Sequence, residues 1–410
     1  MTSNHYASSL SIGRNLARTV EDAAGQLRTK ISEPLDLLVV FAAGYRQEEL
    51  DRELPRVADL VSCRNIVGTT CEGVISGSLE LEAEPALTMW AASFSDTDVV
   101  ATHLDFHAGP DGGGFVGWPD ELTGEWPDNS CIMLLAEPFG FPADGLIERI
   151  NEDRPGIPIV GGMASGAAVP GHARLLFGDN VINKGGLLVR FSPCELPADT
   201  ATPGAQTKES SSLHSGPVFQ TIVSQGCRPI GEKMVITAAE RNVIKTLGGE
   251  LALDKLKKLF ATLPTREQRT IQHVLNIGRV INEYQDSFDY GDFLIRNVIG
   301  IDQETGFLTV GDYMKPGQTV QFHVRDPMAA SAELNSMLTS RELKEPAAAL
   351  LFSCNGRGSH MFPEPHHDAR AVRGTLGEIP LAGFFAGGEI GPVGGRNFMH
   401  GYTASVAMFR

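Results

Sequence analysis

Two groups of polar residues near the end of the chain have side chains that could bind a small molecule. The apolar segment Ala348–Cys354 ends in a cysteine, and Asn355 and Arg357 follow it directly. A glycine-rich segment, residues 379–400, surrounds a single carboxylate, Glu389. A guanidinium can bind a carboxylate through two parallel hydrogen bonds. We therefore expect a site in which Arg357 binds a ligand carboxylate and Glu389 accepts an amine or another hydrogen-bond donor.

Glycines close to these residues are expected to bring the backbone to the ligand. Glycine allows close approach of the main chain, and its N–H groups can point at a bound molecule. Residues 65–77 have the same pattern, a strand that runs into a glycine-punctuated turn. The alternative is a set of tight turns in a compact α/β core. The candidate ligand-binding residues are Thr70, Cys71, Glu72, Cys354, Asn355, Arg357, Gly388, Glu389, Gly391, Gly394, Gly395 and His400.

Arg357 and Cys354 each have an alternative role that stays open. Arg357 and Glu389 could form an ion pair that joins two loops and binds no ligand. Cys354 is also a candidate nucleophile, because a nearby guanidinium favours the thiolate. An ordinary buried cysteine accounts for it as well. No sequence signature supplies a matched base, although His360 or His400 could reach the thiol, so no catalytic residue is assigned beyond this candidate.

Two histidine-containing groups are weaker candidates for metal binding. His103, Asp105 and His107 alternate along a strand, a spacing that can serve a metal, but we favour a solvated strand face because no fourth ligand is in view. Residues 366–368, His-His-Asp, belong to a proline-rich loop. We assign no metal site. The chain also lacks a P-loop, a dinucleotide-binding fingerprint and a Gly-x-Ser-x-Gly elbow, so phosphate and acyl-transfer chemistry have little support.

Composition limits the class of protein and its partners. The chain has 410 residues and a formal net charge of −16, which argues against a nucleic-acid groove and against docking on an anionic membrane. No apolar run approaches the length of a membrane span. Six cysteines lie far apart without a C-x-x-C pair, and the N-terminus lacks the apolar core of a signal peptide. We expect a cytoplasmic protein with reduced thiols.

A strand, a helix and a second strand recur along the chain. The pattern occurs in residues 35–77, returns in 131–166 and returns again in 348–389, and Ile-Pro-x-x-Gly is shared by residues 157–161 and 379–383. This repetition predicts an α/β fold of two related halves with mixed sheets, helices packed on the sheets and internal duplication. We expect an N-terminal helix within residues 1–30 and domains at 31–240 and 241–410. Residues 194–216 are expected to be a polar insertion or linker.

Five segments, taken in order, resemble the FIST domains of bacterial signal-transduction proteins and eukaryotic F-box proteins. They are residues 65–77, 224–231 (SQGCRPIG), 322–326 (FHVRD), 352–358 (FSCNGRG) and 383–392 (GFFAGGEIGP). The resemblance covers most of the chain. It implies a sensory module of signal transduction that binds a small ligand, with amino acids and related carboxylates as proposed ligands. The usual kinase, cyclase, receptor or F-box segment is absent from this sequence.

The resemblance also implies a partner and a cofactor to consider. A signalling protein is the expected partner, and an adaptor that docks through residues 195–216 is an alternative to ligand sensing. Some bacterial members resemble haem-linked nitric-oxide sensors. A haem would need an axial histidine or cysteine, for which His360, His400 and Cys354 are available. The sequence does not choose among these residues.

Overall fold

The chain folds into two compact units. The structure, a computed structural model, describes residues 4–32, 34–109, 112–194, 217–265, 268, 275–285, 288, 291–342 and 345–410. The first unit combines Met1–Ile222 with Leu338–Arg410, and the second unit is Val223–Met337. The first unit therefore consists of two stretches that are far apart in the sequence.

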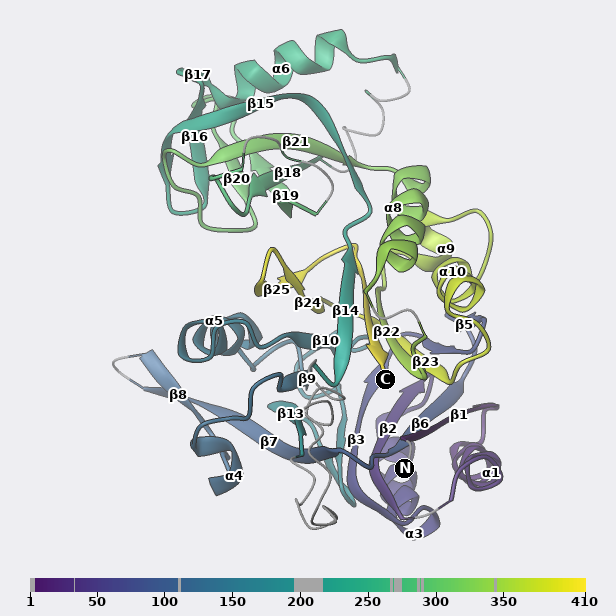
Figure 1. The fold of residues 1–410 in the computed structure, drawn as a ribbon. Helices are drawn as coiled ribbons and strands as arrows, with labels where there is room; N and C mark the ends of the chain where they lie inside the picture. The colour runs from purple at the N-terminus through teal and green to yellow at the C-terminus, as the bar shows by residue number, and fades with distance from the viewer. Residues whose placement is uncertain are drawn as a thin grey trace, which may run out of the picture. The chain divides into compact units, whose positions relative to one another are not determined.

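The first unit contains three copies of a parallel strand pair with helix between the strands (Figure 1). In the first copy, α2 (Gln47–Glu53), η1 (Leu54–Arg56) and α3 (Val57–Leu60) connect β2 (Leu35–Ala43) to β3 (Cys63–Cys71). In the second copy, α5 (Ala143–Asp153) connects β9 (Cys131–Ala136) to β10 (Ile159–Met163). In the third copy, α9 (Gly358–Met361) and α10 (His367–Leu376) connect β22 (Ala348–Cys354) to β23 (Leu381–Ala386). The repeated pattern of the sequence thus corresponds to a repeated structural unit.

An antiparallel strand flanks each parallel pair on both sides. The orders are β6-β2-β3-β11, β13-β9-β10-β24 and β26-β22-β23-β4. The strand that follows each copy joins the sheet of another copy: β4 follows β3 but pairs with β23, β11 follows β10 but pairs with β3, and β24 follows β23 but pairs with β10. The flanking strands are β4 (Val74–Ser76), β6 (Ala86–Ser93), β11 (Leu175–Phe177), β13 (Gly186–Pro193), β24 (Glu389–Val393) and β26 (Ala404–Phe409).

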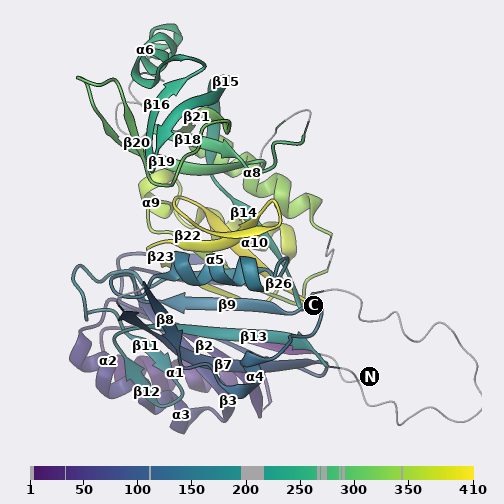
Figure 2. The same ribbon diagram turned by 90° about the vertical axis from the view of Figure 1, so that its left-hand side faces the viewer.

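Other strands extend these three sheets at their edges. The sheet of β2 and β3 also contains β1 (His5–Ile12) and β12 (Asn180–Ile182). The sheet of β9 and β10 also contains β7 (Thr97–Gly109), β8 (Gly112–Val116) and β25 (Arg396–His400). The sheet of β22 and β23 also contains β5 (Leu79–Leu81) and β14 (Phe219–Ser224). Helix α1 (Leu16–Arg28) contacts β1 and β6, and the short α4 (Asp120–Thr123) precedes β9. Figure 2 shows the strands of the first unit stacked in layers.

Glycine occupies the same position in the second strand of each copy. Gly68, Gly161 and Gly383 lie opposite Val40, Leu134 and Leu351. A Cβ atom at these glycines would lie 2.4, 1.9 and 1.8 Å from the carbonyl oxygen of the opposite residue. Real side chains do not tolerate such distances, so the position requires glycine in all three copies. The Ile-Pro-x-x-Gly pattern shared by the second and third copies therefore reflects the close approach of the neighbouring strand at its glycine.

Aromatic side chains from two of these sheets meet in the core of the first unit. Phe41 of β2 lies 4.8 Å from Phe384 of β23 between ring centroids, and Trp90 of β6 lies 4.9 Å from Phe409 of β26. All four side chains are fully buried. Strands buried on both faces have continuous apolar sequences, which explains why β22 coincides with the apolar segment Ala348–Cys354.

The second unit is a closed barrel. Its strands pair in the order β15-β21-β18-β19-β20-β16, and β16 also pairs with β15. Closure leaves no free edge between these strands. They are β15 (Cys227–Glu240), β16 (Val243–Leu247), β18 (Leu275–Val280), β19 (Phe293–Ile301), β20 (Leu308–Val310) and β21 (Thr319–Arg325), with β17 (Glu250–Leu251) at the edge of β16 and α6 (Ala252–Thr262) after it.

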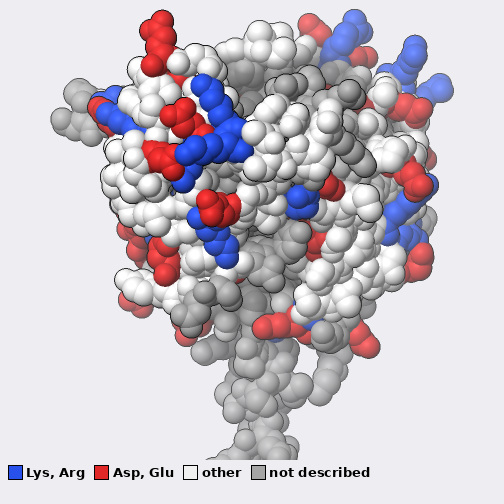
Figure 3. Space-filling view, turned by 90° about the horizontal axis from the view of Figure 1, so that it is seen from above, with Lys and Arg blue, Asp and Glu red and all other residues white. Residues whose placement is uncertain are grey.

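Charged side chains fix the start of helix α8 and pair with one another on the surface. α8 (Pro327–Ser340) begins after Asp326, whose Oδ1 accepts hydrogen bonds from the N–H groups of Met328 and Ala329. Asp326 therefore caps the N-terminus of α8, and Pro327 follows it as the first helical residue. Lys255 and Lys258 of α6 both pair with Glu250. Figure 3 shows one face on which basic and acidic side chains lie beside one another. The charges on that face are mixed in sign and form no continuous basic patch.

The mixed α/β architecture predicted from the sequence is confirmed. The prediction of an N-terminal helix missed β1, which precedes α1. Of the polar insertion expected at residues 194–216, residues 195–216 lie outside the described part of the chain. The domain boundary near residue 240 remains a prediction, whereas the compact units divide at residues 222 and 337. No helix in the described part of the chain is long and apolar enough to cross a membrane.

Candidate functional site

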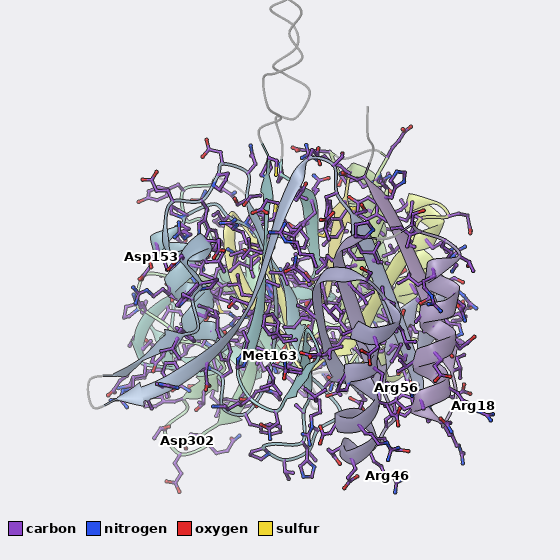
Figure 4. All side chains as sticks on the ribbon, turned by 90° about the horizontal axis from the view of Figure 1, so that it is seen from below. Arg18, Arg46, Arg56, Asp153, Met163 and Asp302 are labelled. Atoms are coloured by element: carbon purple, nitrogen blue, oxygen red, sulfur yellow. The ribbon has the colours of Figure 1, made fainter. Side chains whose placement is uncertain are left out.

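The second strands of the three copies end at the same place in the first unit. At the end of β10, the N–H of Met163 donates to the carbonyl of Gly388 at 2.8 Å, and the N–H of Gly387 donates to the carbonyl of Met163 at 3.0 Å. The N–H of Phe385 donates to the carbonyl of Gly73 at 3.0 Å, which brings the loop after β3 to the same point. Met163 is labelled in Figure 4. The segments that follow β3, β10 and β23 are therefore neighbours.

Ser165 bonds to the other two segments. Its hydroxyl accepts a hydrogen bond from the N–H of Glu72 at 2.8 Å and donates to the carbonyl of Phe385. The side chain is buried. A single hydroxyl thus joins the carboxyl ends of three strands from three copies. Sequence reasoning missed Ser165 because no partner for its hydroxyl lies nearby in the sequence.

The predicted segment of residues 65–77 and the polar residues that follow Ala348–Cys354 also meet in this region. The amide Nδ2 of Asn355, after β22, donates to the carboxylate Oε2 of Glu72, after β3, at 3.0 Å. Both residues are exposed. No described lysine or arginine forms an ion pair with Glu72. We call Glu72, Ser165, Cys354, Asn355 and Glu389 the strand-end site.

A thiol and a carboxyl group lie buried beneath the exposed pair. Thr403 donates to Glu389 Oε2 from its backbone N–H and from its hydroxyl, both at 2.9 Å. Burial raises the pKa of Glu389 to about 7, although Thr403 and the Cys354 side chain favour the charged form. Cys354 is also buried, and its sulfur accepts a hydrogen bond from the N–H of Gly356 at 3.4 Å. Near neutral pH, Glu389 can therefore give up or take a proton beside the Cys354 thiol.

Arg357 has a partner that neither sequence-based interpretation anticipated. Its Nε and Nη2 donate to the two carboxylate oxygens of Asp368 at 2.7 and 2.8 Å, and its Nη1 donates to the carbonyl of Tyr402 at 3.2 Å. Arg357 and Asp368 are both fully buried. Burial alone would raise the pKa of Asp368, but Arg357 holds this pKa well below its usual range. The prediction that Arg357 binds a ligand carboxylate, and its alternative of an ion pair with Glu389, are both corrected to an ion pair with Asp368.

A further acidic residue, Glu80 of β5, lies beside the Arg357–Asp368 pair and binds the N-terminus of α10. Glu80 Oε1 accepts from the N–H of Ala369 at 2.8 Å, and His367 Nδ1 lies 2.9 Å from Asp368 Oδ1. Burial and the charge of Asp368 raise the pKa of Glu80 to about 7. Sequence reasoning missed Glu80, since it lies 288 positions before Asp368 and neither residue's neighbours indicate the pairing.

Several residues that were predicted to bind a ligand are instead paired or packed with other residues of the protein. Thr70 Oγ1 accepts from the N–H of Arg174 at 2.9 Å, and the Cys71 thiol is buried against the carbonyl of Ala42, with its pKa raised by burial. Gly388 packs against the side chains of Met163 and Met399.

The last group of predicted residues belongs to the β24–β25 hairpin. Gly391 accepts a hydrogen bond from His400 Nε2 at 2.9 Å. Gly394 and Gly395 have φ angles of 60° and 79° and form its two-residue turn. They lie at the opposite end of β24 from Glu389, about 16 Å along the strand. Their expected role in supplying N–H groups to a ligand at Glu389 is therefore corrected to a turn.

The three residues named as possible axial ligands of a haem lie in different surroundings. His400 Nε2 faces the carbonyl of Gly391, so this nitrogen carries a proton and cannot ligate iron. Cys354 packs against Glu389, and the side chain of His360 is 66% exposed at the surface beside Glu82. Among the described residues, no three His, Cys, Asp or Glu side chains are arranged to hold a metal ion. His103 Nε2 lies 3.0 Å from the carbonyl of Lys184, and Asp105 pairs with Lys184.

Comparisons with known proteins cover nearly the whole chain. The FIST N domain model matches residues 36–250, and the FIST C domain model matches residues 252–392. An uncharacterized protein of Mycobacterium tuberculosis (strain ATCC 25618 / H37Rv) is 36% identical over 406 residues, 98% of each chain. An uncharacterized protein of Mycobacterium bovis is 35% identical over 392 residues, 95% of this chain and 94% of its own. FIST domains are associated with sensing in signal transduction. The chain therefore belongs to the FIST family.

Proposed function

We propose that this protein is a sensory module that binds a small amine-bearing ligand, an amino acid or a related molecule, at the strand-end site. Glu72 would bind the ammonium group of the ligand, and Asn355 would bind a neighbouring polar group. A signalling protein would respond to the ligand-bound form. The observation that carries the proposal is the exposed pair of Glu72 and Asn355 where strands from three copies of the fold converge.

The position of this pair favours binding. Ligands of α/β proteins bind outside the carboxyl ends of parallel strands, where loops from several strands meet. Glu72 follows β3 and Asn355 follows β22, both members of parallel pairs. Glycines beside them are exposed, at positions 166 and 387, and leave the surface without side chains there. A small molecule can therefore approach both polar groups from solvent.

The charges at the site favour an amine over a carboxylate as the recognised group. The only guanidinium predicted to bind an acid is that of Arg357, and it is buried in an ion pair with Asp368. Glu72 carries an exposed carboxylate. A second carboxylate, that of Glu82, follows Glu72 closely in the sequence and accepts hydrogen bonds from the N–H and the hydroxyl of Ser359. A cationic group is attracted to such a surface, whereas an anion is repelled.

Calorimetric titration with matched ligands tests the proposal. A panel of amino acids is compared with the corresponding 2-hydroxy acids, which keep the carboxylate and the side chain but lack the amine. We expect at least one amino acid to bind and its hydroxy analogue to bind at least tenfold more weakly. Glu72→Gln should weaken binding of that amino acid by tenfold or more, which corresponds to about 1.4 kcal/mol for one charge-assisted hydrogen bond.

Two further variants make the test specific. Asn355→Ala should also weaken binding, because it removes the second exposed group of the pair. Glu152→Gln, which neutralises an exposed carboxylate on α5, should leave binding unchanged. Equal binding by wild type, Glu72→Gln and Glu152→Gln would place the ligand elsewhere and contradict the proposal.

Thiol chemistry at Cys354 is a second candidate, favoured by the neighbouring carboxyl group. Glu389, with its pKa raised to about 7, is suited to accept the thiol proton near neutral pH. Both thiols are buried, but burial and the charge of Glu72 raise the pKa of Cys71, so iodoacetamide should alkylate Cys354 faster than Cys71. Glu389→Gln should slow the labelling of Cys354 at least tenfold. Equal and slow labelling of both thiols would contradict this candidate.

A further inference from the structure

The second unit contains a separate cavity that the strand-end site does not use. It has a volume of about 60 Å³ and is lined by aromatic, apolar and polar side chains. Phe288 and Phe293 lie 6.1 Å apart between ring centroids. The lining also includes His323, Cys227 and Ile295.

His323 presents an unprotonated nitrogen in this lining. Its Nδ1 lies 3.0 Å from the carbonyl oxygen of Gln321, which can only accept a hydrogen bond, so Nδ1 carries the proton. Burial lowers the pKa of His323 to about 4, so the ring is neutral at neutral pH. The remaining nitrogen, Nε2, therefore has a lone pair. No described residue donates a hydrogen bond to it.

A neighbouring amide is also incompletely paired. Asn276 lies opposite His323 in the β18–β21 pairing, and it is fully buried. Its Nδ2 lies 3.9 Å from the Cys227 sulfur, while no described residue is bonded to its Oδ1. Exchanging the amide oxygen and nitrogen would leave the other atom without a partner instead. A buried polar atom without a partner is costly, so the unpaired oxygen of Asn276, on the residue opposite His323, favours a polar group in this region.

The histidine ring is fixed in place by its packing. Its centroid lies 5.1 Å from that of Phe293. A Cβ atom at Gly278 would lie 2.5 Å from the ring carbon Cε1, so glycine at this position makes room for the imidazole. A fixed ring holds the Nε2 acceptor in a constant direction, which reduces the entropic cost of binding a donor.

We propose that this cavity binds a small neutral aromatic N–H heterocycle, an azole ring, whose N–H donates to His323 Nε2 and whose faces contact Phe288 and Phe293. The chemistry of the lining supports this class. The lining has aromatic walls, the fixed acceptor of His323 and no described lysine or arginine. Its carboxylate, Glu333, accepts hydrogen bonds from Ser224 and from the N–H of Gly226. A metal ion fits less well, since no described trio of His, Cys, Asp or Glu side chains is arranged to bind one. The small volume favours a single five-membered ring at the buried end, with any larger part of the molecule outside.

Two probes that differ in a single hydrogen-bond donor test this proposal. Pyrazole has the N–H donor, whereas N-methylpyrazole has almost the same shape without it, and both are neutral at pH 7. The full-length protein, labelled with ¹⁵N, is titrated with each probe while the imidazole nitrogens are followed by NMR. We expect pyrazole to produce a saturable shift of the His323 Nε2 signal. N-Methylpyrazole should bind about tenfold more weakly, the effect of losing one hydrogen bond.

Matched variants assign the effect to this histidine. His323→Phe keeps an aromatic ring but removes the acceptor, and it should abolish the preference for pyrazole. His360→Phe changes an exposed histidine of the first unit and should preserve that preference. Melting curves establish that both variants fold, and the comparison of the two probes on the wild type stands even if His323→Phe does not fold.

Three outcomes would overturn the proposal. The first is equal affinity of the wild type for the two probes, which would mean that no donor is recognised. The second is a preference for pyrazole that survives in folded His323→Phe. The third is the lack of any saturable shift, which would mean that the cavity holds only water. Because the strand-end site lies in the first unit, failure here leaves the amino-acid titrations unaffected, and the reverse also holds.

Discussion

At the scale of single residues, the Arg357–Asp368 ion pair is the main difference between expectation and structure. Both side chains are fully buried, and Ser353 Oγ donates to Asp368 Oδ2 at 2.8 Å in the same network. The sequence identified Arg357 as important but not its partner. Asp368 stands in a segment of histidines and prolines, and only the folding of α10 beside the end of β22 brings it to Arg357.

Removal of one member of this pair should be strongly destabilising. Arg357→Ala leaves the Asp368 carboxylate buried without its cation, so we expect the free energy of unfolding to fall by about 3–5 kcal/mol. Urea denaturation followed by circular dichroism measures this change. The double variant Arg357→Met/Asp368→Leu should regain most of the loss, because apolar replacement removes both charges together. A loss below about 1 kcal/mol in Arg357→Ala would contradict the buried pair.

The pKa of Glu389 predicts how stability depends on pH. Its folded-state value of about 7 exceeds its ordinary value of 4.5, so the folded protein binds this proton more tightly than the unfolded chain. The resulting contribution to stability is fully present below pH 4.5 and is lost as the pH rises to about 7, by roughly 3 kcal/mol.

Unfolding free energies measured between pH 4 and 8 test this dependence. Glu389→Gln should make the decline shallower in that window. Glu80 titrates in the same window, because its pKa is also raised to about 7, so Glu80→Gln should remove a second part of the decline. Asp368 acts in the opposite direction and at lower pH, since its pKa is lowered. An unchanged slope in Glu389→Gln would contradict the assigned pKa.

At the scale of elements, apolar strands were predictable and glycine turns were only partly so. The ranges of β2, β9 and β22 follow from continuous apolar runs. β1 was missed because serines occupy two of its buried positions, Ser9 and Ser11. The glycines near Glu389 were expected to contact a ligand, but most of them allow one backbone to approach another. Their local sequence is compatible with both roles.

Substitution in the β24–β25 turn separates these roles. Gly394 has a φ of 60° and Gly395 a φ of 79°, the conformation of a turn that favours Asn-Gly. Gly394→Asn should therefore keep the stability within about 0.5 kcal/mol, whereas Gly394→Val should lower it by about 1–2 kcal/mol through strain. Thermal melting measures both effects.

Amino-acid binding provides the second readout for the same two variants. Both folded variants should bind the ligand of the strand-end site as wild type does, because this turn lies at the far end of β24. Weaker binding in Gly394→Asn, with unchanged stability, would mean that the turn contacts the ligand after all.

At the scale of the whole molecule, the exchange of strands among three copies makes the first unit depend on both ends of the chain. β23, β24 and β26 lie after residue 337, yet they pair with β4, β10 and β14, respectively. The repeat was visible in the sequence as a recurring strand, helix and strand pattern. The exchange was not visible, because the pairing of β4, β11 and β24 with other copies is non-local and short strands carry little pattern.

Fragments should show this dependence. A protein of residues 1–222 lacks β23 and β24, which pair with β4 and β10, so we expect no cooperative unfolding transition and poorly dispersed amide signals. A protein of residues 223–337 contains all strands of the closed barrel and should unfold cooperatively. Heteronuclear NMR spectra and melting curves of both fragments decide the matter. A cooperatively folded 1–222 fragment would contradict the shared sheets.

The central claim, ligand sensing at the strand-end site, is tested most directly by native mass spectrometry with a panel of amino acids and their 2-hydroxy analogues. The wild type and Glu152→Gln should each retain one small molecule whose mass identifies an amino acid, and Glu72→Gln/Asn355→Ala should retain none. A bare chain mass for the wild type throughout the panel, or equal retention by the double variant, would contradict the claim.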